Sequence, residues 1–215
     1  ATYYFHYNEQ IPIERRIGIV REWLQLPEDK RPHLIMFYMP EVDHQLHRYG
    51  THSDSVRQAV QFIDHAVRRL NEMTDSIGLP VNYMLVSDHG MIDIDTANPI
   101  RKPEALDTSK FKMAASASLI NLYARNKKYI KETYRKLKGD AINYSVYLKK
   151  NTPKYWRYNK RNDCYNRLGD IILVAEAGKS FNFFRNYTSP GEHGFDNRVP
   201  EMQATFYAWG PAFKT

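Results

Sequence analysis

The chain has 215 residues and a mass of 25.3 kDa, which is enough for one sizeable hydrophobic core. Hydrophobic residues make up 42% and charged residues 26%, and both values are near globular averages, so the composition excludes disorder for most of the chain. The net charge of +7 favours anionic partners, but the Lys and Arg residues are scattered and no recognised nucleic-acid module accompanies them. We therefore expect a solvated basic surface and no sequence-specific binding of nucleic acid.

The sequence also lacks the features of a membrane-spanning or disulfide-rich protein. No window approaches the ~18 consecutive apolar residues that a membrane span needs, so no span is expected. Cys164 is the single cysteine, which excludes an internal disulfide framework and a cysteine zinc site. The first residues carry neither an initiator Met nor the apolar core of a secretion signal, so we expect any such signal to be absent or removed.

Helical and strand-like patterns alternate along the chain, which predicts an α/β fold with a largely parallel sheet flanked by helices. In the first part we expect, in order, a helix over 14–26, a buried strand over 33–39, a helix over 53–73 and a strand over 81–86. A polar surface excursion over 92–110 follows. The remainder predicts a strand over 113–124, a helix over 127–138, a strand over 141–148, a polar loop over 150–167, and strands over 170–176 and 205–209.

Three clusters of carboxylates and imidazoles follow predicted strands or lie in a Gly-flanked loop. Asp43 and His47 are four residues apart, Asp88 and His89 are adjacent, and His193 lies in a loop between glycines. The ends of strands are where open α/β sheets bind ligands. Together the five side chains form a mixed nitrogen and oxygen donor set, which suits zinc better than magnesium or calcium. Taken alone, an Asp beside a His is more often a hydrogen-bonded pair on the surface than a metal site. The prediction therefore depends on all three clusters together.

The order of these clusters resembles the nucleotide pyrophosphatase/phosphodiesterase family of the alkaline phosphatase superfamily. The family motifs have the forms Asp-x-x-x-His-x-Tyr-Gly, Ser-Asp-His-Gly-Met and Gly-x-His-Gly-(Tyr/Phe)-Asp-Asn, and this chain carries them at 43–50, 87–91 and 191–197. The segment 202–214 also resembles the family's segment after the third motif. The resemblance implies an alkaline-phosphatase-like fold. In it, residues 1–215 would form the C-terminal portion of a single phosphodiesterase catalytic domain, with the sheet incomplete on its N-terminal side.

The resemblance further implies a site with two zinc ions. One ion would be held by Asp43, His47 and His193, and the other by Asp88 and His89 together with an Asp and a Thr or Ser nucleophile located before Ala1. The number of ligands agrees with this expectation that one ligand lies before Ala1. Two catalytic zinc ions take about six protein ligands, and the clusters supply five. No catalytic nucleophile is nominated within the chain. Two residues depart from the family pattern, His44 and Leu46, where the family has small residues.

Asp196 and Asn197 are candidates for orienting His193 from outside the metal's own ligand set, although a structural turn is an equal alternative. The expected function is hydrolysis of a phosphodiester or pyrophosphate through a covalent phospho-enzyme. The expected substrate is a nucleotide-like small molecule, although relatives of this kind also act on choline phospholipids. The resemblance places such a protein in the periplasm or outside the cell, and the upstream part of the same protein is its expected partner.

Two alternatives to this function stay open. The first is another hydrolase of the superfamily that acts on phosphomonoesters or phosphonates, which the form of the third motif disfavours. A sulfatase is disfavoured because the residues after Cys164 do not match that group's modified-cysteine motif. The second alternative is a catalytically silent metal-binding fragment. The zinc stoichiometry distinguishes an enzyme, with about two ions per complete protein, from a silent fragment with one or none.

Overall fold

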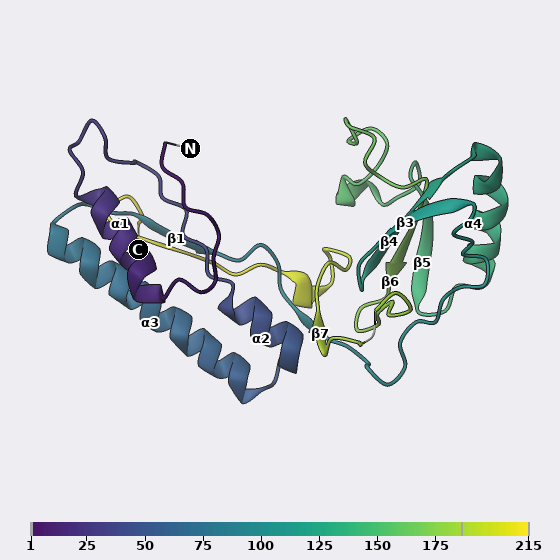
Figure 1. The fold of residues 1–215 in the computed structure, drawn as a ribbon, viewed down its shortest axis with the longest axis horizontal. Coiled ribbons are helices and arrows are strands. Elements are labelled where there is room, and N and C mark those ends of the chain that lie inside the picture. Colours follow the sequence, from purple (N-terminus) through teal and green to yellow (C-terminus); the bar gives the residue numbers. More distant parts are fainter. Residues whose placement is uncertain (1, 186, 215) are drawn as a thin grey trace. The chain divides into compact units, whose positions relative to one another are not determined.

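The computed structural model describes residues 2–185 and 187–214, and its contacts divide into two compact units. The first unit comprises Ala1–Gln45, His52–Val86 and Phe206–Thr215, and the second comprises Leu46–Thr51 and Ser87–Thr205. Helices and strands both occur, as the predicted α/β class requires (Figure 1). Each unit has its own hydrophobic core.

Two helices and a pair of strands build the first unit. Helices α1 (Ile13–Leu24) and α3 (Asp54–Ile77) pack on each other through a core of Ile17, Val20, Leu24 and Met73. Strands β1 (Tyr83–Val86) and β8 (Phe206–Trp209) pair in antiparallel register. One face of this pair contacts α3, because the Tyr83 ring stacks on Trp209 at 4.8 Å and the Trp209 indole N–H donates to Asn71 on α3.

The predicted strand over 33–39 is wrong, because the segment pairs with no strand among the residues that the structure describes. Its side chains nevertheless alternate as in a strand. Ile35 and Phe37 pack against the core between α1 and α3, whereas Leu34, Met36 and Tyr38 are exposed. The apolar run that indicated a strand buried on both faces is therefore buried on one face only.

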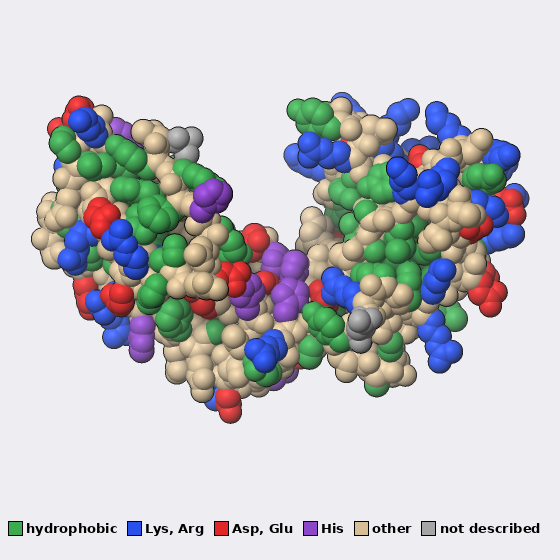
Figure 2. Space-filling model, in the orientation of Figure 1, with side chains coloured by type: hydrophobic (Ala, Val, Ile, Leu, Met, Phe, Trp, Pro, Cys, Tyr) green, Lys and Arg blue, Asp and Glu red, His purple; other side chains and the backbone are tan. Residues whose placement is uncertain are grey.

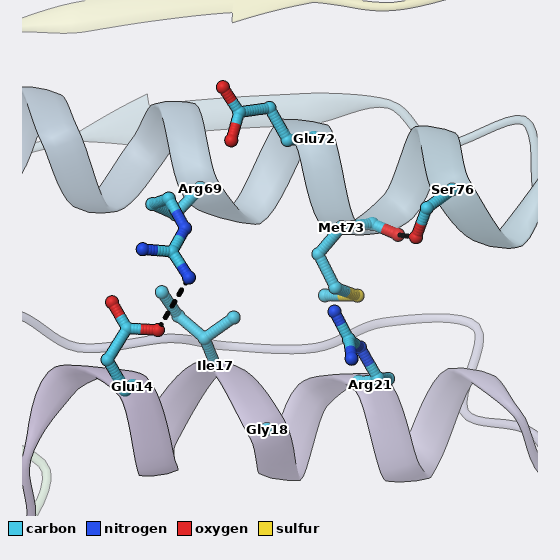
Figure 3. Close-up of a pocket in the computed structure, with 8 residues that line it drawn as sticks. All are labelled: Glu14, Ile17, Gly18, Arg21, Arg69, Glu72, Met73 and Ser76. Atoms are coloured by element: carbon cyan, nitrogen blue, oxygen red, sulfur yellow. Dashed lines mark hydrogen bonds and ion pairs between the residues drawn. The ribbon is translucent and has the colours of Figure 1, made fainter.

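A shallow cavity of about 320 Å³ lies between α1 and α3 within the first unit (Figure 3). Ile17 and Met73 form its apolar part, and Glu14 accepts a hydrogen bond from Arg69 across its mouth at 2.9 Å. Gly18 lies on the α1 side and contributes no side chain. The cavity is therefore a gap in the packing of the two helices, and both acidic and basic side chains line it.

The second unit is built on a four-stranded sheet in the order β3-β4-β6-β5. The strands are β3 (Phe111–Ala115), β4 (Leu119–Ala124), β5 (Tyr144–Leu148) and β6 (Ile171–Ala175), and β6 is fully buried. Helix α4 (Ile130–Gly139), preceded by the 3₁₀ turn η1 (Lys127–Tyr129), connects β4 to β5, which confirms the predicted β-α-β stretch. Figure 2 shows Lys and Arg side chains spread over this sheet and α4 rather than lining a groove.

Two predictions about this sheet need correction. All the named ladders in the described part of the chain are antiparallel, and parallel pairing occurs only in the isolated bridge between Ile100 and Phe181. The predicted strand over 113–124 is a hairpin of β3 and β4, because the chain reverses at 116–118. Alternating elements suggested parallel strands, but β6 inserts between β4 and β5 and runs antiparallel to both.

Short elements complete the second unit. Strands β2 (Ile92–Asp93) and β7 (Gly191–Glu192) pair in antiparallel register, and the 3₁₀ turns η2 (Lys154–Trp156) and η3 (Pro200–Met202) lie in the connecting segments. Helix α2 (Glu41–Tyr49) runs across the boundary at which the contacts divide into units. No helix among the described residues is long and apolar enough to cross a bilayer.

Candidate metal centre

Helix α2 carries the first cluster. Asp43 and His47 are four residues apart on this one helix, which places both side chains on the same face. The cluster was expected in a polar segment after a strand; the helix was not predicted, because α2 has no buried residue that would mark a core face. Two signals could have revealed it, namely acidic residues in the first turn and Gly50 directly after the last.

The short β2–β7 ladder brings the second and third motifs together. Asp93 on β2 pairs with Gly191 on β7, so Asp88 and His89, which precede β2, approach the loop that carries His193. Asp93 also accepts hydrogen bonds from the backbone N–H and the hydroxyl of Thr51, at 2.6 and 2.7 Å, and Thr51 lies just beyond α2. Gly191 allows the close approach of β7 to α2, because a Cβ there would lie 2.3 Å from the Leu46 carbonyl oxygen.

Asp43, His47 and His193 form a group that could hold a metal ion. One ligand atom from each side chain lies within 4.8 Å of the others, and all three side chains are partly buried. The rings of His47 and His193 have centroids 5.0 Å apart. Figure 2 shows a group of His side chains beside α2. A carboxylate oxygen with two imidazole nitrogens is a donor set that zinc accepts, so the residues fit the metal that the sequence implied.

Asp88 and His89 lie beside this group without joining it. His89 Nε2 is 3.5 Å from Asp88 Oδ1, and the His89 ring stacks on His193 with centroids 3.6 Å apart. Two ligands of one tetrahedral zinc, each about 2.0–2.2 Å from the ion, lie roughly 3.3 Å apart. The spacing of this pair therefore suits a shared ion, and the assignment of Asp88 and His89 to a second metal stays a prediction.

Backbone carbonyls define the tautomers of two of these imidazoles. His47 Nδ1 lies 2.8 Å from the Gly191 carbonyl oxygen, and His89 Nδ1 lies 2.9 Å from the carbonyl oxygen of Gly90. A carbonyl oxygen can only accept, so Nδ1 is the protonated nitrogen in both rings. Each neutral ring therefore has its lone pair on Nε2, which is the nitrogen that a metal would take.

Asp196 and Asn197 follow His193 in the same loop. The Asp196 carboxylate accepts from the Tyr155 hydroxyl at 2.5 Å and from the backbone N–H of Arg198 at 2.9 Å. Burial opposes ionisation of this carboxyl, but these hydrogen bonds outweigh it and lower the pKa of Asp196. The contacts anchor the loop to the segment around η2. A role of Asp196 or Asn197 in orienting His193 stays a prediction.

Several side chains that support the site were not predicted from the sequence. Ser189 is buried and donates toward the carbonyl oxygens of His47 and Gly191, at 2.5 and 2.9 Å. Glu192, the last residue of β7 and directly before His193, is a buried carboxylate. Tyr155 comes from the polar loop more than thirty residues away in sequence. No sequence motif could have identified these residues, because polar residues of every type are common in such segments.

Fold and site together define an α/β protein with a candidate metal centre whose three residues come from the first and third sequence motifs. Residues 1–196 match the family model described as type I phosphodiesterase / nucleotide pyrophosphatase. The chain belongs to this family. The resemblance inferred from the three motifs is thereby confirmed.

Individual relatives agree with this assignment. Ectonucleotide pyrophosphatase/phosphodiesterase family member 1 of Rattus norvegicus is 33% identical over 97% of this chain, which covers 24% of the rat protein. Venom phosphodiesterase of Naja atra is 32% identical over 99% of the chain, which covers 26% of the venom protein. The solved structure of murine ectonucleotide pyrophosphatase/phosphodiesterase 5 superposes with a TM-score of 0.88 at 30% identity, covering 99% of this chain and 56% of the murine one. The alkaline-phosphatase-like fold class is thus confirmed, although the chain spans only part of each relative's length.

Proposed function

We propose that this chain supplies metal-binding residues of a zinc-dependent hydrolase of phosphodiesters or pyrophosphates. The observation that carries the proposal is the convergence of Asp43, His47 and His193 from the first and third family motifs. Asp88 and His89, from the second motif, are proposed to hold a second zinc. Bound zinc would supply positive charge that stabilises the charge developing on phosphoryl oxygens, and would lower the pKa of a water molecule.

Backbone groups of this chain would hold and orient the proposed zinc ligands. The Gly191 carbonyl oxygen accepts a hydrogen bond from His47 Nδ1–H, which places the lone pair on Nε2, the nitrogen that would bind zinc. Gly90 does the same for His89. A covalent phospho-enzyme is part of the proposal, but we assign its nucleophile to no residue of this chain.

A nucleotide-like substrate is the best-supported class. One relative is named bis(5′-adenosyl)-triphosphatase, and the structure of an inactive form of the murine relative is described as a complex with AMP. The chain's net charge of +7 would attract such anions over a distance. Other relatives are named as ectonucleotide enzymes or venom enzymes, so we propose an extracellular location for this protein.

Zinc binding to the purified 215-residue chain tests the metal assignment. We expect weak binding or binding at one site, because the five proposed ligands fall short of the six that two ions take. His193→Ala should weaken zinc binding by more than the ~10–100-fold that loss of an outer partner costs. Isothermal titration measures this, and His65→Ala, an exposed histidine on α3, is the matched control. Equal zinc affinity in the His193 and His65 variants would contradict the assignment.

Hydrolysis of a nitrophenyl nucleotide diester in excess zinc tests the rest of the mechanism. We expect no turnover by this chain alone, because no nucleophile is assigned within it. Turnover that His193→Ala abolishes would show that the chain holds a nucleophile.

A further inference from the structure

We propose that Glu192 is a positioning residue for His47, and that Arg185 anchors it. The proposal rests on the proposed function, because it concerns how a candidate zinc ligand is held. Glu192 is the variable residue of the third motif, between Gly191 and His193, and no role is predicted for it from the sequence. All the residues that carry the argument lie in the second unit.

Glu192 is a charged residue in a buried position. Its side chain is 8% exposed, and its Oε2 lies 3.8 Å from His47 Nδ1. The ladder with Ile92 on β2 holds its backbone. Removing a carboxylate from water is costly unless its charge is compensated, so a buried charge at this place requires nearby positive groups.

Arg185 supplies part of that compensation. Its Nη1 lies 3.0 Å from Glu192 Oε1, and its guanidinium lies over the Phe184 ring at 5.6 Å. The ion pair engages one carboxylate oxygen and leaves the other toward His47. Arg185 therefore fixes the direction in which the Glu192 charge acts.

The effect of that charge on His47 follows from the ring's hydrogen bond. His47 Nδ1 donates to the Gly191 carbonyl, so the ring carries its proton on the side that faces Glu192. A negative charge near Nδ1–H favours this tautomer and increases electron density at Nε2, which strengthens Nε2 as a metal ligand. Glu192 also adds negative charge beside a site for a dication. Both effects act in the same direction, toward tighter zinc binding.

Two substitutions separate a charge effect from a packing effect. Glu192→Gln keeps the size of the side chain and can still accept from Arg185, but it removes the charge. Glu192→Asp keeps the charge and shortens the side chain. If Glu192 positions His47 through its charge, Glu192→Gln should weaken zinc binding by ~10–100-fold and Glu192→Asp should weaken it less. A packing role predicts the opposite order.

The measurement is zinc affinity of the 215-residue chain by titration, with the melting temperature of the zinc-free chain recorded for each variant. Glu104→Gln, an exposed carboxylate of the same unit, is the control and should bind zinc as the unchanged chain does. Arg185→Gln should weaken binding in the same direction as Glu192→Gln, and the double variant should lose little more than Glu192→Gln alone. A Glu192→Gln affinity within threefold of the control, or weaker binding by Glu192→Asp than by Glu192→Gln, would overturn the inference.

The same experiment distinguishes failure of the inference from failure of the proposed function. If His193→Ala abolishes zinc binding and Glu192→Gln leaves it unchanged, the metal site stands and the role of Glu192 is wrong. If the unchanged chain binds no zinc at all, the metal assignment is wrong and the role of Glu192 is wrong with it. A lower melting temperature without a change in zinc affinity would assign Glu192 to folding alone.

Discussion

At the scale of single residues, two of the candidate ligands, His47 and His89, are held by hydrogen bonds to backbone carbonyls. His47 donates to Gly191, His89 donates to Gly90, and Ser189 ties the end of α2 to the β7 strand. A carbonyl oxygen can only accept a hydrogen bond, so it specifies one tautomer of each neutral imidazole. Side chains with a charge, such as Glu192, then adjust a geometry that the backbone already sets.

Asp95, just beyond β2, should make stability depend on pH in the acid range. The Lys179 ammonium, 2.7 Å away, and Asn98 hold the pKa of Asp95 at about 2, below its ordinary 3.8. A lowered pKa stabilises the folded chain fully above pH 3.8, and the contribution is lost as the pH falls through about 2. Asp95→Asn should therefore reduce the stability measured by urea unfolding at pH 6, with the difference from the unchanged chain shrinking toward pH 2.

Added salt should reduce this difference, because the pair is partly exposed to solvent. Lys179→Met should cause the same kind of loss, and the two substitutions together should not add. A difference between the unchanged chain and Asp95→Asn that stays constant from pH 6 to pH 2 would contradict this account.

At the scale of elements, two helical glycines with free space around them should respond oppositely to alanine. Gly18 lies inside α1, where an added Cβ would meet only Arg15 Nη1 at 3.9 Å. Gly18→Ala should raise the free energy of unfolding by about 0.5–1 kcal/mol, because glycine loses more chain entropy than alanine in a helix. Gly78 follows the last residue of α3 and has a left-handed φ of +74°, which alanine adopts only at a cost. Gly78→Ala should therefore lower the free energy of unfolding by about 1–2 kcal/mol, although no atom lies within 4 Å of the added Cβ.

Urea unfolding of the two variants measures both changes. The pair is informative because steric room is available at both positions, so only the backbone conformation differs. A loss of stability in both variants would indicate that the cavity between α1 and α3 needs Gly18 for a reason other than helix propensity.

At the scale of the whole molecule, the first unit has an uncovered apolar face. Met36 is 91% exposed, and Met84, Val86 and Phe206 are each more than 60% exposed on the face of the β1–β8 pair opposite α3. Large apolar side chains that are exposed close together, as Met84, Val86 and Phe206 are, mark surfaces that associate with other molecules. We therefore expect the 215-residue chain to associate with itself or bind a hydrophobic dye, with light scattering rising with concentration.

Two neighbouring residues on opposite faces test the cause. Met36→Gln should reduce self-association and leave the free energy of unfolding within about 0.5 kcal/mol. Phe37→Gln should instead destabilise the chain by roughly 1–3 kcal/mol, because Phe37 packs against the core between α1 and α3. A chain that remains monomeric at high concentration would contradict the prediction.

Much of the local structure and the family followed from the sequence by itself. Hydrophobic periodicity revealed α1, α3 and α4, and apolar runs revealed β1, β6 and β8, because these elements bury a face whose period appears in the residue order. The three motifs identified the family and named Asp43, His47 and His193 before their geometry was known. Spacing within one motif is local information, which a sequence displays directly.

The tertiary structure alone decided features that depend on distant contacts. The 33–39 segment has the pattern of a strand but finds no pairing partner among the described residues, because pairing depends on what another segment offers. Helix α2 lacks a buried face, and β6 pairs with two strands in a direction that residue order does not encode. Glu192 reads in the sequence as an ordinary surface residue. Its burial between Arg185 and His47 arises only when β7 pairs with β2 and approaches α2, more than a hundred residues away along the chain.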